Sequence, residues 1–260
     1  MASRHTDSKT KQGHLPFRQH GGARKGAGRK PNGERAGVSH RQRAALASRF
    51  PVHVTCKLRR GLPRLRRKPE HAALRAAFLA GNDRFGFRLA HYAILDDHLH
   101  LIVEAGGRDS IRRGLQGLLI RIARALNKLW QRKGKVFADR YHDHILRSPK
   151  EVRNALRYVL ENAKKHAAEG GVQIRTPIDV FSSAPWFDGF RQRIVVRGLE
   201  AIARPVAAAR TWLLRIGWRR HGLLSLADVR APDVRAPDVP AADVPAPGLV
   251  PTGGLVPSRS

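Results

Sequence analysis

The chain has 260 residues, of which 42% are hydrophobic, so it is long enough to bury one or two cores. Lys and Arg number 50 against 20 Asp and Glu, which gives a formal net charge of +30 at pH 7. This excess of cations attracts polyanions and gives binding that weakens with salt. Nucleic acid is therefore the first partner to consider, and an anionic membrane surface is its competitor.

Several classes of protein are excluded by what the sequence lacks. No apolar run approaches the length of a membrane span, and the N-terminus carries charges without an apolar signal core. The single cysteine, Cys56, excludes an intramolecular disulfide and any zinc module built on several cysteines. We expect a soluble, cytoplasmic protein from a reducing compartment, with no membrane partner. The sequence does not decide between a monomer and a homodimer.

Residues 1–48 are rich in Gly, Lys and Arg and have little apolar periodicity, which predicts a disordered basic arm. Within residues 21–31 the arm places cations among glycines, namely Arg24, Lys25, Arg29 and Lys30. This stretch resembles an AT-hook, although Gly-Arg-Lys-Pro stands where the core of the hook has Gly-Arg-Pro. The simpler interpretation is a solvated tail that grips DNA phosphates without reading sequence.

Ordered structure is expected from Pro51 onward. The first four elements in chain order are a strand over residues 52–58, a helix over 69–81, and strands over 85–95 and 99–104. The strands are rich in β-formers, and the first alternates apolar with polar residues. Pro69 suits the first turn of the helix. The short polar link Asp96-Asp97 predicts a hairpin between the last two strands.

Three more elements follow in the order helix, strand, helix. Ser110 is expected to cap a long helix that reaches residue 132 and has an apolar stripe beside several arginines. A strand is expected over residues 141–146. Ser148 and Glu151 form a capping-box pattern around Pro149, which predicts a helix from there to about residue 168.

The element order β-α-β-β-α-β-α predicts an α+β fold. Its first six elements match the ferredoxin-like arrangement, a four-stranded antiparallel sheet backed by two helices, with one additional helix at the end. Residues 50–170 are therefore expected to form one domain. Residues 171–226 are interpreted as a small basic appendage, with helical spacing over 205–218. Residues 227–260 repeat a Pro-Ala-Asp-Val pattern, which predicts a disordered tail.

His98 and His100 form a His-x-His pair. His98 directly precedes the strand expected over residues 99–104, and His100 lies within it. Strand side chains alternate, so both imidazoles project from the same face while Leu99 and Leu101 project from the other. The pair is either part of a metal site or two polar residues on the wet face of a sheet. The chain has 13 histidines, and His142 and His144 form a second pair of this kind. A structural zinc site would need four protein ligands, and no obvious cluster completes one.

Asn154, Tyr158 and Asn162 recur every four residues on the last predicted helix and therefore share its polar face. Lys165 lies on the same face. By itself, Tyr158 could simply rest its ring on the rim of the core with its hydroxyl in water.

The combination and order of these motifs resemble those of the HUH single-tyrosine transposases, most closely the REP-associated tyrosine transposases. His98-Leu99-His100 stands at the HUH motif, and residues 157–162 with the following Lys164, Lys165 and His166 stand at the tyrosine helix. Residues 134–137 and 140–143 also look like the segment between the two motifs. The chain departs from the family pattern at Asp96-Asp97, where Pro-Asn or Pro-Glu is usual, and at Ala163, where proline is common.

The resemblance implies an enzyme that cleaves and rejoins single-stranded or hairpin DNA through a 5′-phosphotyrosine link. Tyr158 would be the nucleophile, and His98, His100 and Asn162 would be ligands of Mg²⁺ or Mn²⁺. The DNA backbone would be held by cations of the arm and of two helices: Arg24, Lys25, Arg29, Lys30, Arg112, Arg113, Arg121, Arg124 and Lys165. Trp130, Phe137 and Tyr141 are candidate stacking platforms for bases, although core packing is the favoured role for Phe137.

Two other functions compete with this enzyme. A non-catalytic nucleic-acid-binding protein of the same ferredoxin-like class would use the positive charge equally well, although the sheet lacks the aromatic pattern of RNA-recognition modules. A structural metal protein would use both His-x-His pairs and would lose its fold on chelation.

Overall fold

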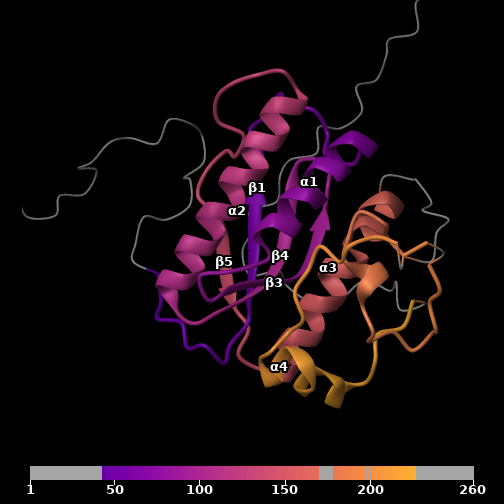
Figure 1. The fold of residues 1–260 in the computed structure, drawn as a ribbon. Helices are drawn as coiled ribbons and strands as arrows, with labels where there is room; N and C mark the ends of the chain where they lie inside the picture. The colour runs from indigo at the N-terminus through magenta and orange to yellow at the C-terminus, as the bar shows by residue number, and fades with distance from the viewer. Residues whose placement is uncertain (1–42, 170–177, 197, 200, 227–260) are drawn as a thin grey trace, which may run out of the picture. The chain divides into compact units, whose positions relative to one another are not determined.

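The computed structural model describes residues 43–169, 178–196, 198–199 and 201–226 (Figure 1). Within the range 162–169 it describes only the course of the helix. The expected tail, and the expected arm up to residue 42, lie outside the described residues.

The sheet has five strands in the order β2-β3-β4-β1-β5, and all of its pairings are antiparallel. Its strands are β1 (Val52–Lys57), β2 (Asp83–Arg84), β3 (Phe87–Ile94), β4 (His98–Ala105) and β5 (His142–Ile145). The four longer strands and their connections follow the expected β-α-β-β-α-β order, and β2 only extends β3 into a short hairpin. The predicted α+β, ferredoxin-like class is therefore confirmed.

Helices α1 (Lys68–Gly81) and α2 (Arg108–Leu129) lie together on one face of the sheet (Figure 1). Their apolar stripes bury the side of β4 that carries Leu99 and Leu101. The approach of α2 to the sheet requires a glycine, because a Cβ at Gly114 would lie 2.2 Å from the side chain of Phe87. This packing forms the larger of two buried apolar clusters among the described residues.

Helix α3 (Pro149–Glu169) covers the opposite face of the sheet, where Val152, Leu156 and Val159 join a second apolar cluster. The predicted capping pattern is present, because the Ser148 hydroxyl accepts the Glu151 amide at 3.2 Å. The Glu151 carboxylate reaches one residue further back than a standard capping box and accepts the amide of Arg147 at 2.5 Å. None of the helices in the described ranges combines the length and the apolar character needed to cross a membrane.

The start of α2 differs from the expectation. The helix begins at Arg108, so Ser110 lies inside its first turn and the capping position belongs to Gly107. The Gly107 carbonyl accepts the Ile111 amide at 3.1 Å, which opens the helix one turn earlier than the apolar stripe suggests. The prediction that Ser110 is the cap was therefore wrong.

The described residues beyond 177 pack on α3 and along the outer edge of β3. Backbone hydrogen bonds of 2.8–2.9 Å join this segment to the strand: Ile94 to Phe181, Ser183 to Tyr92, and Ala207 to Leu89. An exposed strand edge is a template for unwanted pairing, and this segment covers it. Trp218 is almost fully buried, so the segment contributes to the second core.

The helix expected over residues 205–218 is much shorter in the structure. Only α4 (Trp212–Arg215) and a 3₁₀ turn at Gly217–His221 are helical in this region. The cause is Glu104 of β4, a buried carboxylate that accepts the amides of Arg210 and Thr211, each at 2.8 Å. It also accepts the Thr211 hydroxyl at 2.8 Å and pairs with Arg88 at 3.3 Å. These tertiary contacts outweigh the local helical spacing.

Glu104→Ala should lower the free energy of unfolding by about 3–5 kcal/mol, because it leaves the amides of Arg210 and Thr211 without their buried acceptor and leaves Arg88 paired only with Asp83. Urea unfolding monitored by circular dichroism measures this change. Asp109→Ala, which removes an exposed carboxylate from α2, is the matched control and should change the free energy of unfolding by about 0.5 kcal/mol or less. Equal effects of the two substitutions would contradict the role given to Glu104.

Candidate active site

The two histidines of β4 and the tyrosine of α3 lie on the same side of the sheet. Alternation along β4 directs His98 and His100 away from Leu99 and Leu101, toward the face that α3 covers. The Tyr158 hydroxyl lies 3.4 Å from Nε2 of His100, and the centroids of the two rings are 4.9 Å apart. The packing of α3 therefore brings together two sequence motifs that are 58 residues apart.

The two imidazoles approach each other through the same ring atom. Nε2 of His98 lies 3.1 Å from Nε2 of His100, and the ring planes are nearly perpendicular. Two nitrogens bound at right angles to one ion at about 2.1 Å would be about 3.0 Å apart. The observed spacing therefore suits two adjacent ligands of a divalent cation.

A third ligand is needed to complete such a site. Within the ranges that the structure describes, no group of three His, Cys, Asp or Glu side chains is arranged to hold a metal ion. Asn162, the amide residue predicted from the sequence, belongs to α3 one turn beyond Tyr158, but its side chain lies outside the described residues. Asn162 therefore remains a prediction as a ligand.

Each imidazole is also held through its other nitrogen. Nδ1 of His98 lies 2.6 Å from Oδ1 of Asp97, and this hydrogen bond lowers the pKa of the Asp97 carboxyl. Nδ1 of His100 lies 3.2 Å from both His53 Nε2 and Thr55 Oγ1. Sequence reasoning missed these three neighbours. Two of them depend on the pairing of β1 with β4, which places Thr55 opposite His100 and is not readable from the sequence.

His53 connects the site to the second His-x-His pair. It is paired with His144 across β1 and β5, and Thr55 is paired with His142, so both histidine pairs lie on one face of the sheet. Burial, and secondly the charges of His144 and His142, lower the pKa of His53 to about 4. His53 is therefore neutral at pH 7. The structural metal interpretation requires all four histidines of the two pairs in one site, and the described histidines are not grouped in this way.

The three aromatic residues considered as stacking platforms pack against the cluster beneath α1 and α2. The Arg43 guanidinium lies 3.7 Å from the ring centroid of Tyr141, and burial raises the pKa of this tyrosine. Trp130 donates its indole N–H to Glu70 at 3.0 Å. Phe137 packs on the same cluster. Tyr141 thus lies on the sheet face opposite His98 and His100, which separates it from the candidate site.

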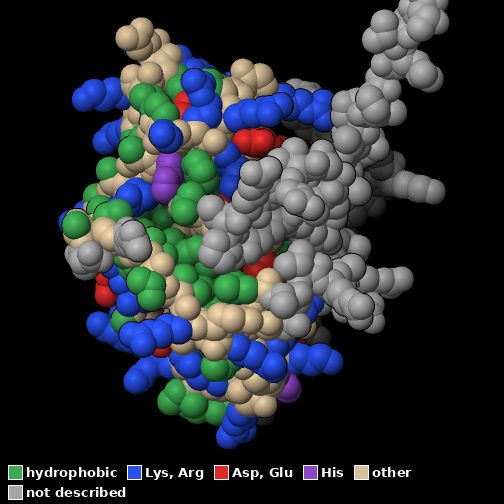
Figure 2. Space-filling view, turned by 90° about the vertical axis from the view of Figure 1, so that its right-hand side faces the viewer, with side chains coloured by type: hydrophobic (Ala, Val, Ile, Leu, Met, Phe, Trp, Pro, Cys, Tyr) green, Lys and Arg blue, Asp and Glu red, His purple; other side chains and the backbone are tan. Residues whose placement is uncertain are grey.

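The arginines expected to hold DNA lie on α2, also on the far face of the sheet. Arg112, Arg113 and Arg124 are exposed, whereas the Arg121 guanidinium bends back to the Gly117 carbonyl at 3.1 Å. On the site's own face, the exposed Lys57 is the cross-strand partner of His98. The side chain of Lys165 and the four arm cations lie outside the described residues. Figure 2 shows Lys and Arg side chains around much of the visible face and few acidic ones.

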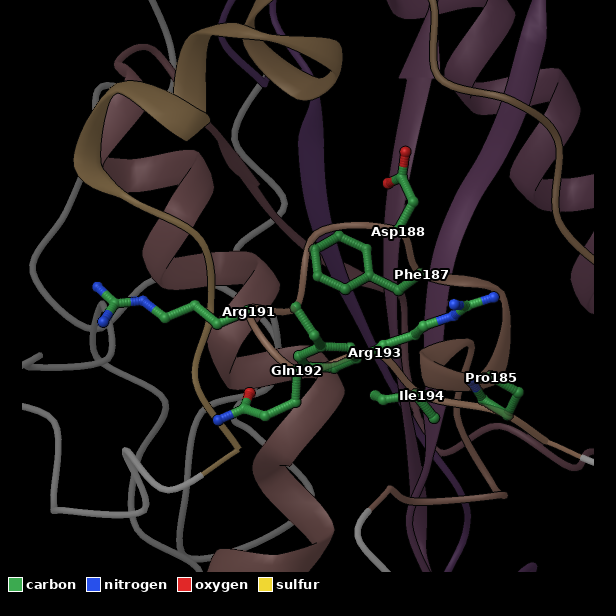
Figure 3. Close-up of a pocket in the computed structure, with 8 residues that line it drawn as sticks. Pro185, Phe187, Asp188, Arg191, Gln192, Arg193 and Ile194 are labelled. Atoms are coloured by element: carbon green, nitrogen blue, oxygen red, sulfur yellow. The ribbon is translucent and has the colours of Figure 1, made fainter.

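A separate hollow of about 350 Å³ lies in the segment after α3 (Figure 3). Phe187 leans over it, while the guanidinium ends of Arg191 and Arg193 point away from its centre. Its described lining includes a single carboxylate, Asp188, which pairs with Arg219 at 2.9 Å. No histidine or cysteine belongs to the described lining of this hollow.

Comparisons with known proteins give only distant similarities. No family model matches the chain, and no curated protein matches it. The solved structure of a REP-associated tyrosine transposase bound to a REP hairpin is similar over 56% of this chain and 83% of that chain, with 17% identity and a TM-score of 0.44. A Deinococcus radiodurans protein described as a transposase is 12% identical over 53% of this chain and 99% of its own, with a TM-score of 0.34.

A third solved structure, a bacterial tRNA(His) guanylyltransferase (Thg1)-like protein in complex with GTP, is 14% identical. It is similar over 52% of this chain and 72% of that chain, with a TM-score of 0.37. These similarities are too distant to indicate a function, so the function must be argued from the side chains of this chain.

Chelation should leave the protein folded, because both apolar clusters are complete without the imidazoles. Near-ultraviolet circular dichroism with and without EDTA should give the same spectrum, and the thermal midpoint should fall only by the stabilisation that bound metal supplies. Loss of the near-ultraviolet signal in EDTA would instead identify a structural metal.

Proposed function

We propose that residues 50–170 form a metal-dependent DNA strand transferase, a transposase that cleaves and rejoins single-stranded or hairpin DNA through a covalent phosphotyrosine. The observation that carries this proposal is the meeting of three groups from two elements. The Tyr158 hydroxyl lies 3.4 Å from Nε2 of His100, which lies 3.1 Å from Nε2 of His98. A nucleophile beside two converging imidazoles is the minimum arrangement for metal-assisted attack on a phosphodiester.

The chemistry requires help for a weak nucleophile, because a tyrosine hydroxyl ordinarily has a pKa near 10. The Tyr158 oxygen forms a bond to phosphorus and releases its proton to water, while the bond from phosphorus to the 3′ oxygen breaks and that oxygen takes up a proton from water. The products are a 5′-phosphotyrosine link and a free 3′ hydroxyl. A Mg²⁺ or Mn²⁺ ion bound by His98, His100 and Asn162 would polarise the phosphate and stabilise charge on the leaving oxygen.

Rejoining needs no nucleotide cofactor, since the phosphotyrosine conserves the energy of the cleaved phosphodiester. A 3′ hydroxyl attacks the same phosphorus, and the Tyr158 oxygen leaves. The α3 helix holds Tyr158 in place by burying its opposite face, including Leu156 and Val159, in the second cluster. A fixed hydroxyl position favours in-line attack in both directions.

DNA would be held by cations on both faces of the sheet. Lys57 is the cross-strand partner of His98 and would contact a phosphate next to the scissile one. Arg112, Arg113, Arg121 and Arg124 of α2, Lys165 of α3, and the arm cations Arg24, Lys25, Arg29 and Lys30 would bind flanking phosphates. The net charge of +30 supports a polyanionic partner, and we place this activity in the cytoplasm.

The main alternative is a non-catalytic nucleic-acid-binding protein of the same fold. RNA-recognition modules bind bases on an open face of the sheet. Here α1 and α2 cover one face, while α3 and the segment after it cover much of the other. This arrangement favours the enzyme, and binding without any cleavage across several hairpins would favour the alternative.

Incubation of the protein with Mn²⁺ and a labelled hairpin oligonucleotide should yield a covalent protein–DNA adduct on a denaturing gel. Tyr158→Phe removes the attacking oxygen and should abolish the adduct, and His100→Ala should reduce it at least about 100-fold. Tyr141→Phe is the matched control, because its ring lies on the other face of the sheet. An adduct that persists in Tyr158→Phe but disappears in Tyr141→Phe would overturn the assignment.

Binding to the same hairpin should weaken with salt. Replacing Arg112, Arg113 and Arg124 with Gln should reduce the slope of log affinity against log salt by about 0.7–0.9 for each phosphate that is no longer neutralised. Fluorescence anisotropy at several salt concentrations measures the slope. Tyr158→Phe should bind with the wild-type slope, since it removes no charge. An unchanged slope in the triple variant would show that α2 does not touch DNA.

A further inference from the structure

The contact between Asp97 and His98 differs in kind from the contacts of His100. A carboxylate can only accept a hydrogen bond, so Asp97 at 2.6 Å requires a proton on Nδ1 of His98. A neutral imidazole with its proton on Nδ1 has a lone pair on Nε2, and in His98 this lone pair can accept a hydrogen bond from His100 or bind a cation. This pattern of carboxylate, histidine and metal recurs in metalloproteins, where the outer carboxylate fixes the orientation and tautomer of the ligand.

Thr55 and His53 do not fix the tautomer of His100 in the same way. A threonine hydroxyl both donates and accepts, and a neutral imidazole nitrogen can do either. Nδ1 of His100, at 3.2 Å from Thr55 and from His53, can therefore carry a proton or lack one. His100 can donate its Nε2–H to His98 when no cation is bound, and can then shift its proton to Nδ1 when Nε2 is needed as a ligand.

The position of Asp97 is set by the backbone and not by its ion pair. Its carbonyl accepts the Leu58 amide at 2.8 Å, and the Leu95 amide donates to the His98 carbonyl at 3.0 Å across the hairpin. The carboxylate is thus delivered to His98 by the tight connection between β3 and β4. Its neighbour Asp96 is similarly exposed but lies 4.0 Å from Arg64 instead of touching a histidine.

We propose that Asp97 is a positioning residue that holds His98 in the Nδ1–H tautomer, with Nε2 ready to bind a metal ion. His100, whose neighbours Thr55 and His53 can each donate or accept, moves its proton to Nδ1 when the cation binds. This inference rests on the proposed function, because it assumes that the two Nε2 atoms bind a divalent ion. It gives a role to a residue at which the chain departs from the related transposase pattern.

Long-range ¹H–¹⁵N correlation spectra of the metal-free protein, labelled at histidine, test the tautomer directly. His98 should be the Nδ1–H form in the wild type, with its signals assigned by their loss in His98→Gln. Asp97→Ala should shift His98 toward the Nε2–H form, and Asp96→Ala should leave it unchanged. An Nδ1–H form that survives in Asp97→Ala, or an Nε2–H form in the wild type, would overturn the proposal.

Mn²⁺ titration followed by electron paramagnetic resonance measures the consequence for metal binding. Asp97→Ala should weaken the affinity about 10- to 100-fold, as expected when an outer-sphere partner is removed. Asp96→Ala removes the same charge from the adjacent position and should weaken it less than about 3-fold. Equal weakening in both variants would reduce the role of Asp97 to its charge. Absence of Mn²⁺ binding by the wild type would instead refute the metal site on which the proposed function depends.

Discussion

The alternation of side chains along β4 is the constraint on which the rest of the structure depends. One strand of eight residues buries leucines beneath α1 and α2 and directs two imidazoles to the opposite face. A shift of register by one residue would exchange these faces and would place the imidazoles in the apolar core. The pairing of β4 with β1 and β3 on both sides prevents such a shift. The position of the candidate site therefore depends on the strand register of the whole sheet.

The face of β4 that carries the histidines has a candidate site at one end and a structural anchor at the other. His98 and His100 lie at one end of the strand, beside Tyr158. Glu104 lies at the other end and anchors the segment after α3 through the amides of Arg210 and Thr211. This segment and α3 share the second apolar cluster, so the appendage expected from the sequence supports the helix that carries Tyr158. Loss of the Glu104 contacts would therefore disturb the candidate site through the packing of α3.

The sequence predicted those features that follow from local periodicity. Alternation placed His98 and His100 together, the capping pattern located the start of α3, and the element order indicated the ferredoxin-like sheet. It could not predict contacts that depend on register or on packing between distant segments. Thr55 and His53 contact His100 only because of the pairing of β1 with β4. The helix expected over residues 205–218 is shortened by contacts with Glu104, which is more than 100 residues away in the chain.

The central claim is that Tyr158 attacks the phosphate, and peptide mapping of the covalent adduct tests it most directly. The chain has three tyrosines, and trypsin separates them, since it cleaves after Arg157 and Lys164 around Tyr158 and after Arg140 and Arg147 around Tyr141. Mass spectrometry after nuclease treatment should find the nucleotide on the peptide of residues 158–164. A nucleotide on the peptide of residues 141–147, or on the one that contains Tyr92, would contradict the account.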